Sequence, residues 1–370
     1  MSEHGDREAP PAAQGRALRA LVAAACLVVV FAGLKASGDI LLPVIFSVFL
    51  SILAAPGVKA LERVGVPVPV AILLVVVAVA GVLLTFTGVI VGTVRTFTAK
   101  MPEYEAPMQQ LVTQALTELQ RWGVAQDLGD LRSMLQPSQV MALVGQTLNA
   151  TVSIFSRLVI VTLTMTFILF EQSELAKKTA VAFGTGTRLE GPFANAPADV
   201  QRYLFIKTCV SLATGILVGA WCYALGLDFA LMWGLVAFLL NYIPTIGSIL
   251  AAIPPILLAL VQLGLVPAVG VAAGFLVVNI CLGNLLEPRL LGRSLGLSPL
   301  VVFLSLLFWG WLWGPAGMLI CVPMTVIAKL VLESHDDTRW IAVLLGSARD
   351  VQSVEGPPRP RPAPAVQENV

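Results

Sequence analysis

Long apolar runs alternate with short polar stretches along most of this chain. Six of the runs approach the roughly 20 mostly apolar residues that one membrane-crossing helix needs. They cover residues 18–34, 40–56, 68–98, 151–170, 204–225 and 267–286. This pattern predicts an all-α polytopic membrane protein.

Two further apolar segments, 229–261 and 300–332, carry helix breakers near their middle. Asn-Tyr-Ile-Pro-Thr-Ile-Gly interrupts the first at 241–247, and Gly-Pro-Ala-Gly interrupts the second at 314–317. Each arm has about 12–18 residues, which is short for a full crossing and favours a re-entrant or broken hairpin. With the single spans this makes about eight membrane segments. The two hairpins would enter from opposite sides, as an inverted repeat does.

Basic residues orient these segments. With a cytoplasmic N-terminus, and each hairpin returning to its own side, most of the 23 Lys and Arg residues lie in the cytoplasm, in agreement with the positive-inside rule. If a hairpin were instead two full crossings, the loops before and after it would still lie on the same side of the membrane. The charges therefore do not distinguish the two arrangements, and only the length of the arms favours hairpins. The predicted order is a disordered cytoplasmic tail (1–17), scaffold spans (18–98), an extracytoplasmic helical insert (99–150), a fourth span with a cytoplasmic connector (151–203), a transport core (204–332) and a cytoplasmic tail (333–370).

Composition narrows the class of protein. The chain is 57% hydrophobic and only 12% charged, with a mean hydropathy of +0.86, which excludes a soluble domain and a disordered chain. A net charge of +1 provides no basic face for nucleic acid. Two histidines, and five cysteines with no Cys-x-x-Cys pair, leave little material for a metal centre or a catalytic triad. We expect no enzyme, no catalytic residues, no metal and no cofactor.

The first helix break is the main candidate binding site. Pro244 lacks an amide donor and Gly247 adds backbone freedom, so backbone groups near the break lose their helical partners. Inside a membrane such groups must meet protein, water or a ligand. The side chains of Asn241, Tyr242, Thr245 and Ser248 add hydrogen-bonding capacity there. The alternative is a tight hairpin tip that is sealed by its own packing.

A second polar cluster follows the last single span. Asn284 and Glu287 lie beside apolar residues, and ionisable groups at such positions are costly and often functional. Glu287 could bind a cation or a proton. It could equally form an ion pair with Arg289 or Arg293.

Glycines four residues apart recur inside the apolar runs, at 88/92, 215/219, 270/274 and 310/314. In lipid such pairs let two helix backbones approach closely. We interpret them as static packing, with a sliding interface between moving helices as the alternative.

Several motifs in order resemble the autoinducer-2 exporter (AI-2E) family, the group that includes PerM-like permeases. They are the 241–247 break with Pro254, Asn-Leu-Leu-Glu-Pro-Arg-Leu-Leu-Gly at 284–292, Leu-Gly-Leu-Ser-Pro-Leu at 295–300, and Gly314, Gly317 and Pro323. The resemblance implies a multi-pass protein of the bacterial cytoplasmic membrane, homo-oligomers such as pentamers, and transport. Some relatives are linked to export of autoinducer-2 and others to sodium/proton antiport. This chain has Ser298 where histidine is frequent, and Thr245 and Ser248 where tyrosine and proline are common.

These observations support three hypotheses. The first is a secondary transporter that exports a small polar solute by alternating access, with the hairpins moving against the scaffold. The second is a cation/proton antiporter in which Glu287 is the exchanging carboxylate. The third is a membrane scaffold that transports nothing and binds a partner through its insert.

Overall fold

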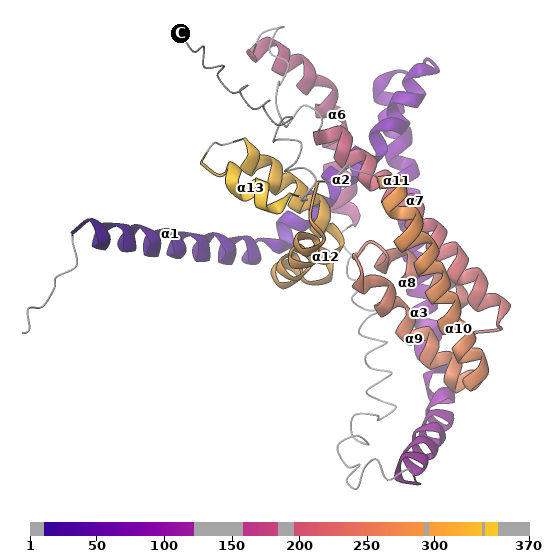
Figure 1. The fold of residues 1–370 in the computed structure, drawn as a ribbon. Coiled ribbons are helices and arrows are strands. Elements are labelled where there is room, and N and C mark those ends of the chain that lie inside the picture. The colour runs from indigo at the N-terminus through magenta and orange to yellow at the C-terminus, as the bar shows by residue number, and fades with distance from the viewer. Residues whose placement is uncertain (1–10, 122–157, 184–195, 292–295, 335–336, 347–370) are drawn as a thin grey trace, which may run out of the picture.

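The computed structural model describes residues 11–121, 158–183, 196–291, 296–334 and 337–346, and within these ranges all regular structure is helical. Figure 1 shows the arrangement of the helices. Their bounds are α1 Pro11–Ala36, α2 Gly38–Arg63, α3 Val68–Arg121, α6 Leu158–Phe183, α7 Ala196–Ala224, α8 Ala230–Leu240, α9 Ile246–Gln262, α10 Leu265–Val278, the π-helix η1 Asn279–Leu286, α11 Glu287–Leu291, α12 Pro299–Glu333 and α13 Arg339–Leu345.

Five described helical segments are long and apolar enough to cross a membrane: Gly38–Arg63, Val68–Lys100, Ala198–Ala224, Leu265–Leu291 and Pro299–Glu333. The predicted single spans 40–56, 68–98 and 267–286 each lie inside one of them, and 204–225 does so except for its last residue. Their outward faces carry many exposed large apolar side chains, as lipid-facing helices do. The class of fold predicted from the apolar runs is therefore confirmed as an all-helical, multi-pass architecture.

The third span and the start of the predicted insert form one continuous helix. α3 runs for 54 residues across Lys100, with Pro102 and Pro107 inside it, and its last turns project beyond α9 and α10 (Figure 1). The helix therefore continues past the end of the apolar run at residue 98 into the start of the predicted helical insert. The rest of the insert, from residue 122, lies outside the described residues.

Both predicted helix breaks are present. Between α8 and α9 the chain leaves the helix at 241–245, where Thr245 has a positive φ of 58°. In α12 the backbone is non-helical at Trp313 and Gly314, with φ of −130° and 62°. Proline and glycine explain both positions, since one lacks a helical donor and the other adopts left-handed conformations without strain.

The two arms at each break fold back against each other. In the first, the Asp228 amide before α8 donates to Gln262 Oε1 at the end of α9, at 3.0 Å. In the second, the Trp309 indole donates to Thr325 Oγ1 at 3.0 Å, and Lys329 Nζ donates to the Gly296 carbonyl at 2.8 Å. We call residues 229–262 the first hairpin and residues 299–333 the second hairpin.

Three apolar clusters hold these elements together. One joins the outer part of α3 to α7, α8, α9 and α10, and another joins α2, α3 and α6. The third brings Ile243, at the tip of the first hairpin, against Leu312 and Ile320 of the second hairpin and Leu204 of α7. The two hairpins therefore meet at the tip of the first.

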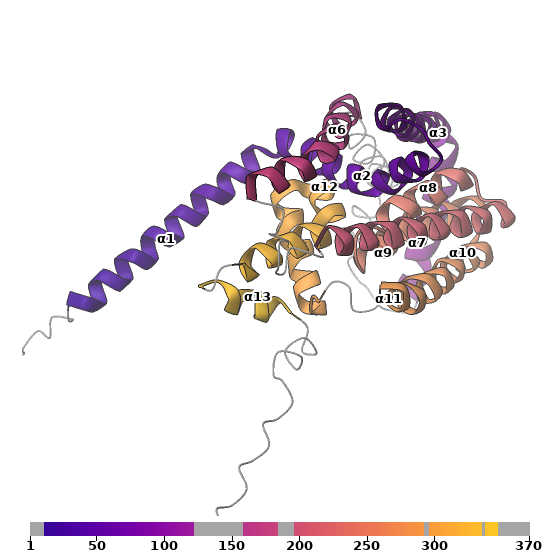
Figure 2. The same cartoon turned by 90° about the horizontal axis from the view of Figure 1, so that it is seen from above.

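The first helix lies apart from the rest. α1 extends sideways from the bundle in both views (Figures 1 and 2), and most of its apolar side chains are exposed. Its C-terminal part contacts the second hairpin, where the Trp313 indole donates to the Leu34 carbonyl at 3.0 Å and Phe31 packs edge-on against Phe308.

Candidate functional site

The tip of the first hairpin is hydrogen bonded to α7. Asn241 is buried, and its Nδ2 donates to Ser211 Oγ at 3.0 Å. The Tyr242 hydroxyl donates to Thr208 Oγ1 at 2.8 Å, and Thr208 in turn donates to the Leu204 carbonyl at 2.7 Å. Two of the predicted site residues are thus brought together with two residues that were missed. Thr208 and Ser211 could have been found as polar positions within an otherwise apolar run.

The remaining predicted residues at the tip form the turn between α8 and α9 or begin α9. Thr245 is exposed, and its hydroxyl donates to the Pro244 carbonyl at 2.7 Å. The Pro244 carbonyl also accepts from the Ile246 amide at 2.6 Å. A Cβ at Gly247 would collide with the Leu240 carbonyl, so this glycine allows α9 to begin beside the end of α8. Ser248 is half-buried in the first turn of α9.

Tyr242 and Thr208 border a cavity of about 1230 Å³ between the scaffold helices and the hairpins. Its walls are residues of α2, α3, α7, α8 and the second hairpin, and they are mostly aliphatic or aromatic. Large, mostly apolar cavities with a few polar groups are the usual form of small-molecule sites. The polar pair at the hairpin tip is therefore exposed to a space that can hold a solute.

Glu287 forms an ion pair with Lys207 of α7 and not with Arg289, which the sequence had offered as one partner. Lys207 Nζ lies 2.6 Å from Glu287 Oε1, with side-chain exposures of 6% and 16%. Arg289 is exposed, and Arg293 lies outside the described residues. Lys207 precedes Thr208 directly, so α7 links the two predicted clusters. Asn284 is exposed on η1, one turn before Glu287.

A π-helix precedes Glu287. Residues Asn279–Leu286 adopt the wider π pattern before α11 begins at Glu287. Pro288 cannot donate to the carbonyl one turn earlier, which favours a shift of hydrogen-bond register at this position. Short π segments are rare and occur often at functional sites, and no sequence pattern indicated this one.

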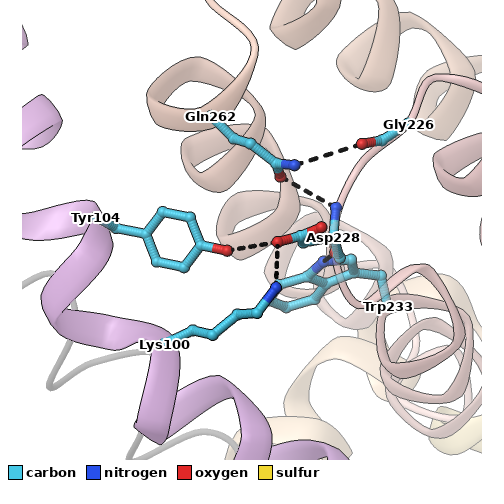
Figure 3. A network of polar contacts seen from close by, with 6 residues as sticks. All are labelled: Lys100, Tyr104, Gly226, Asp228, Trp233 and Gln262. Atoms are coloured by element: carbon cyan, nitrogen blue, oxygen red, sulfur yellow. Dashed lines mark hydrogen bonds and ion pairs between the residues drawn. The ribbon is translucent and has the colours of Figure 1, made fainter.

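A second polar network lies at the base of the first hairpin (Figure 3). Asp228 Oδ2 accepts from the Tyr104 hydroxyl at 2.7 Å and from Lys100 Nζ at 3.2 Å. The Asp228 carbonyl accepts from the Trp233 indole at 3.0 Å. Gln262 completes the network by donating to the Gly226 carbonyl at 3.4 Å. This network attaches α3 to both ends of the hairpin.

These contacts shift two pKa values. The hydrogen bond from Tyr104, helped by Lys100, lowers the pKa of Asp228 despite its partial burial. Burial, and then the bond to the Asp228 carboxylate, raises the pKa of Tyr104. The network is therefore formed by a carboxylate acceptor and a phenol donor at neutral pH.

An Asp228→Asn substitution is expected to destabilise the protein by about 1–2 kcal/mol, because it replaces a charge-assisted acceptor at a partly exposed site. Folding lowers the pKa of Asp228. The carboxylate therefore contributes fully to the stability of the fold at pH values above about 4, the ordinary pKa of an aspartate. This contribution is lost as the pH falls through the lowered pKa. Thermal unfolding at neutral and acid pH tests this, because the gap between wild type and variant should close in acid. A gap that is constant with pH would contradict it.

Among the described residues, no group of three or more His, Cys, Asp or Glu side chains could hold a metal ion. Cys26, Cys209 and Cys281 are exposed, whereas Cys222 and Cys321 are buried. The polar side chains at these places offer hydrogen bonds and the Lys207–Glu287 ion pair.

Long apolar helices and two broken hairpins together define a multi-pass helical membrane protein. The family model described as AI-2E family transporter matches residues 24–336. The chain belongs to the AI-2E transporter family.

Three relatives illustrate this membership. The AI-2 transport protein TqsA of Escherichia coli is 37% identical over 328 residues, covering 89% of this chain and 95% of the relative. A Haemophilus influenzae protein is 37% identical over 338 residues, covering 90% and 97%. The YhhT protein of Escherichia coli is 33% identical over 336 residues, covering 91% and 96%.

Proposed function

We propose that this protein is a secondary transporter that exports a small polar solute resembling autoinducer-2 by alternating access. The observation that carries the proposal is the Tyr242–Thr208 pair at the wall of the large cavity, where the tip of a broken hairpin meets α7. The name of one relative, AI-2 transport protein TqsA, supports this class of solute.

In this proposal both hairpins are re-entrant. α8 has 11 residues and α9 has 17, so at about 1.5 Å per residue neither spans a hydrocarbon core of about 30 Å comfortably. The hydrogen bond between Asp228 and Gln262 keeps both ends of the first hairpin together. The distribution of basic residues supports cytoplasmic termini in the bacterial inner membrane, with the first hairpin entering from outside and the second from inside.

In this proposal α2, α3 and α6 form the scaffold, and the hairpins with α7 form the moving part. α2 and α6 are joined inside the bundle by the Ser47 hydroxyl, which donates to the Val161 carbonyl at 2.9 Å. The cavity divides this pair and α3 from α7, α8 and the second hairpin. Alternating access would open the cavity to one side and then to the other, with the hairpin tips as the movable wall.

A Tyr242→Phe variant tests the proposal in vesicles that contain the purified protein. Uptake of autoinducer-2 into inside-out vesicles is expected to fall about two- to tenfold, since one hydroxyl is removed at the cavity wall and the ring remains. Tyr223→Phe is the matched control, because this second tyrosine also lines the cavity but is largely exposed. Equal uptake by both variants would reject the assignment of the hairpin tip, and no uptake by the wild type would reject this solute.

The Lys207–Glu287 pair favours a second candidate function, cation/proton antiport. A buried ion pair within a membrane bundle is expensive and marks ion pathways. Glu287 would be the exchanging carboxylate, as Asn284 and Glu287 were predicted to help bind a ligand or cation.

A further inference from the structure

Lys207 is a charged residue inside the protein. It lies in α7 within the apolar segment Ala198–Ala224, and its side chain is only 6% exposed. Its ammonium donates to Glu287 Oε1 at 2.6 Å. The carboxylate is the more accessible partner, at 16% exposed. A solute ion would therefore reach Glu287 before it reached Lys207.

Among the described residues, each ion of this pair has the other as its main counter-charge. Tyr203 interacts electrostatically with Glu287, and Cys321 of α12 interacts with Lys207. Tyrosine and cysteine side chains are ordinarily neutral near pH 7. Arg202 and Arg289 are exposed, and Arg202 Nη2 donates to the Leu290 carbonyl at 3.5 Å.

An isolated charge cannot remain at this position without a large cost. Removing one partner of a buried pair leaves an uncompensated ion, and a buried lysine without a counter-ion tends to release its proton. Any cation that binds the Glu287 carboxylate must displace the ammonium of Lys207. The displaced lysine is then the group that loses its proton and becomes neutral.

We propose that Lys207 is the proton-carrying residue of this transporter, acting as a tethered cation that a small monovalent cation replaces at Glu287. In the resting state the ammonium binds the carboxylate. When the cation binds the carboxylate, one N–H bond of the ammonium breaks and the proton leaves to solvent as the lone pair returns to nitrogen. One positive charge enters and one leaves, so the site keeps the same net charge.

The surroundings provide the freedom that this exchange needs. The π-helix η1 ends where Glu287 begins α11, and short π segments of this kind are frequent at functional sites. Lys207 is adjacent to Thr208 at the cavity wall. Movement of the ammonium away from Glu287 would therefore disturb the hydrogen bond between Tyr242 and Thr208.

The proposal rests on the antiport function and is tested with the full-length protein in vesicles that contain the pH dye pyranine. Pulses of NaCl, LiCl or KCl are compared with choline chloride, and radioactive sodium uptake is measured in parallel. In the wild type we expect sodium or lithium to release protons. Lys207→Arg keeps a cation beside Glu287 but cannot deprotonate, so exchange is expected to fall about tenfold or more while the protein still folds. Glu287→Gln should lose both sodium uptake and proton release.

The outcomes separate this inference from the exporter proposal. Wild-type rates of proton release in Lys207→Arg would overturn the role of Lys207, because arginine would serve equally well in a purely structural pair. A wild type that moves autoinducer-2 but exchanges none of the cations would overturn both the inference and antiport, and would leave the exporter function intact. Normal size-exclusion profiles of the variants establish that lost exchange does not reflect misfolding.

Discussion

A Gly234→Ala variant is expected to unfold several degrees below the wild type. A Cβ at Gly234 would lie 2.6 Å from the Gly215 carbonyl oxygen and 3.1 Å from Gly219 Cα. α7 and α8 would have to separate, and such overpacking costs about 1–3 kcal/mol, which exceeds the roughly 1 kcal/mol that alanine contributes over glycine inside a helix. Because α8 leads to Asn241 and Tyr242, transport should fall together with stability.

Gly88→Ala is the matched control for this substitution. Gly88 also lies inside an apolar helix, and a Cβ added there meets nothing within 4 Å. Its thermal midpoint should stay the same or rise slightly. Equal midpoints for the two variants, measured by tryptophan fluorescence in detergent, would show that the α7–α8 backbones are not in close contact.

A Glu287→Ala variant is expected to lose about 3–5 kcal/mol of stability, because the Lys207 ammonium would remain buried without its counter-ion. The double variant Lys207→Met/Glu287→Gln should recover most of that loss, since neither side chain then carries a charge. The pair as a whole therefore contributes far less to stability than either ion costs alone.

The Lys329–Glu333 pair is the control for this cycle. It is longer, at 3.6 Å, and its carboxylate side is 29% exposed. Glu333→Ala should therefore cost no more than about 1 kcal/mol. Thermal unfolding of these three variants and the wild type tests the prediction, and a double variant as unstable as Glu287→Ala would contradict it.

Much of the fold followed from local patterns. The apolar runs predicted the helices, because a helix in lipid must satisfy its own backbone and present apolar side chains all round. Pro244, Gly247 and Gly314 marked the breaks for equally local reasons. Two helix ends did not follow from polarity. The helix of α3 continues past residue 98, where the apolar run ends, and α1 begins at Pro11, inside the stretch predicted as a disordered tail.

For the candidate site, the sequence indicated some of the polar residues but not the residues that they contact. Asn241 and Tyr242 were predicted as site residues because they are polar groups near a break, and their partners Ser211 and Thr208 are 30 and 34 residues away. For Glu287 the sequence suggested nearby arginines, whereas the ion pair forms with Lys207, 80 residues away. Neighbours on a short helix point in different directions, so closeness in sequence was a poor guide.

The amino-acid sequence by itself determined that this protein is a helical membrane protein with two interrupted segments, because hydrophobicity, proline and glycine act on the backbone where they stand. Only the tertiary structure decided which polar groups meet across the bundle: Lys207 with Glu287, Tyr242 with Thr208, and Asp228 with Tyr104. Those pairings depend on how each helix is rotated and how closely it approaches its neighbour. The small residues of α7 and α8 set that approach through packing between helices.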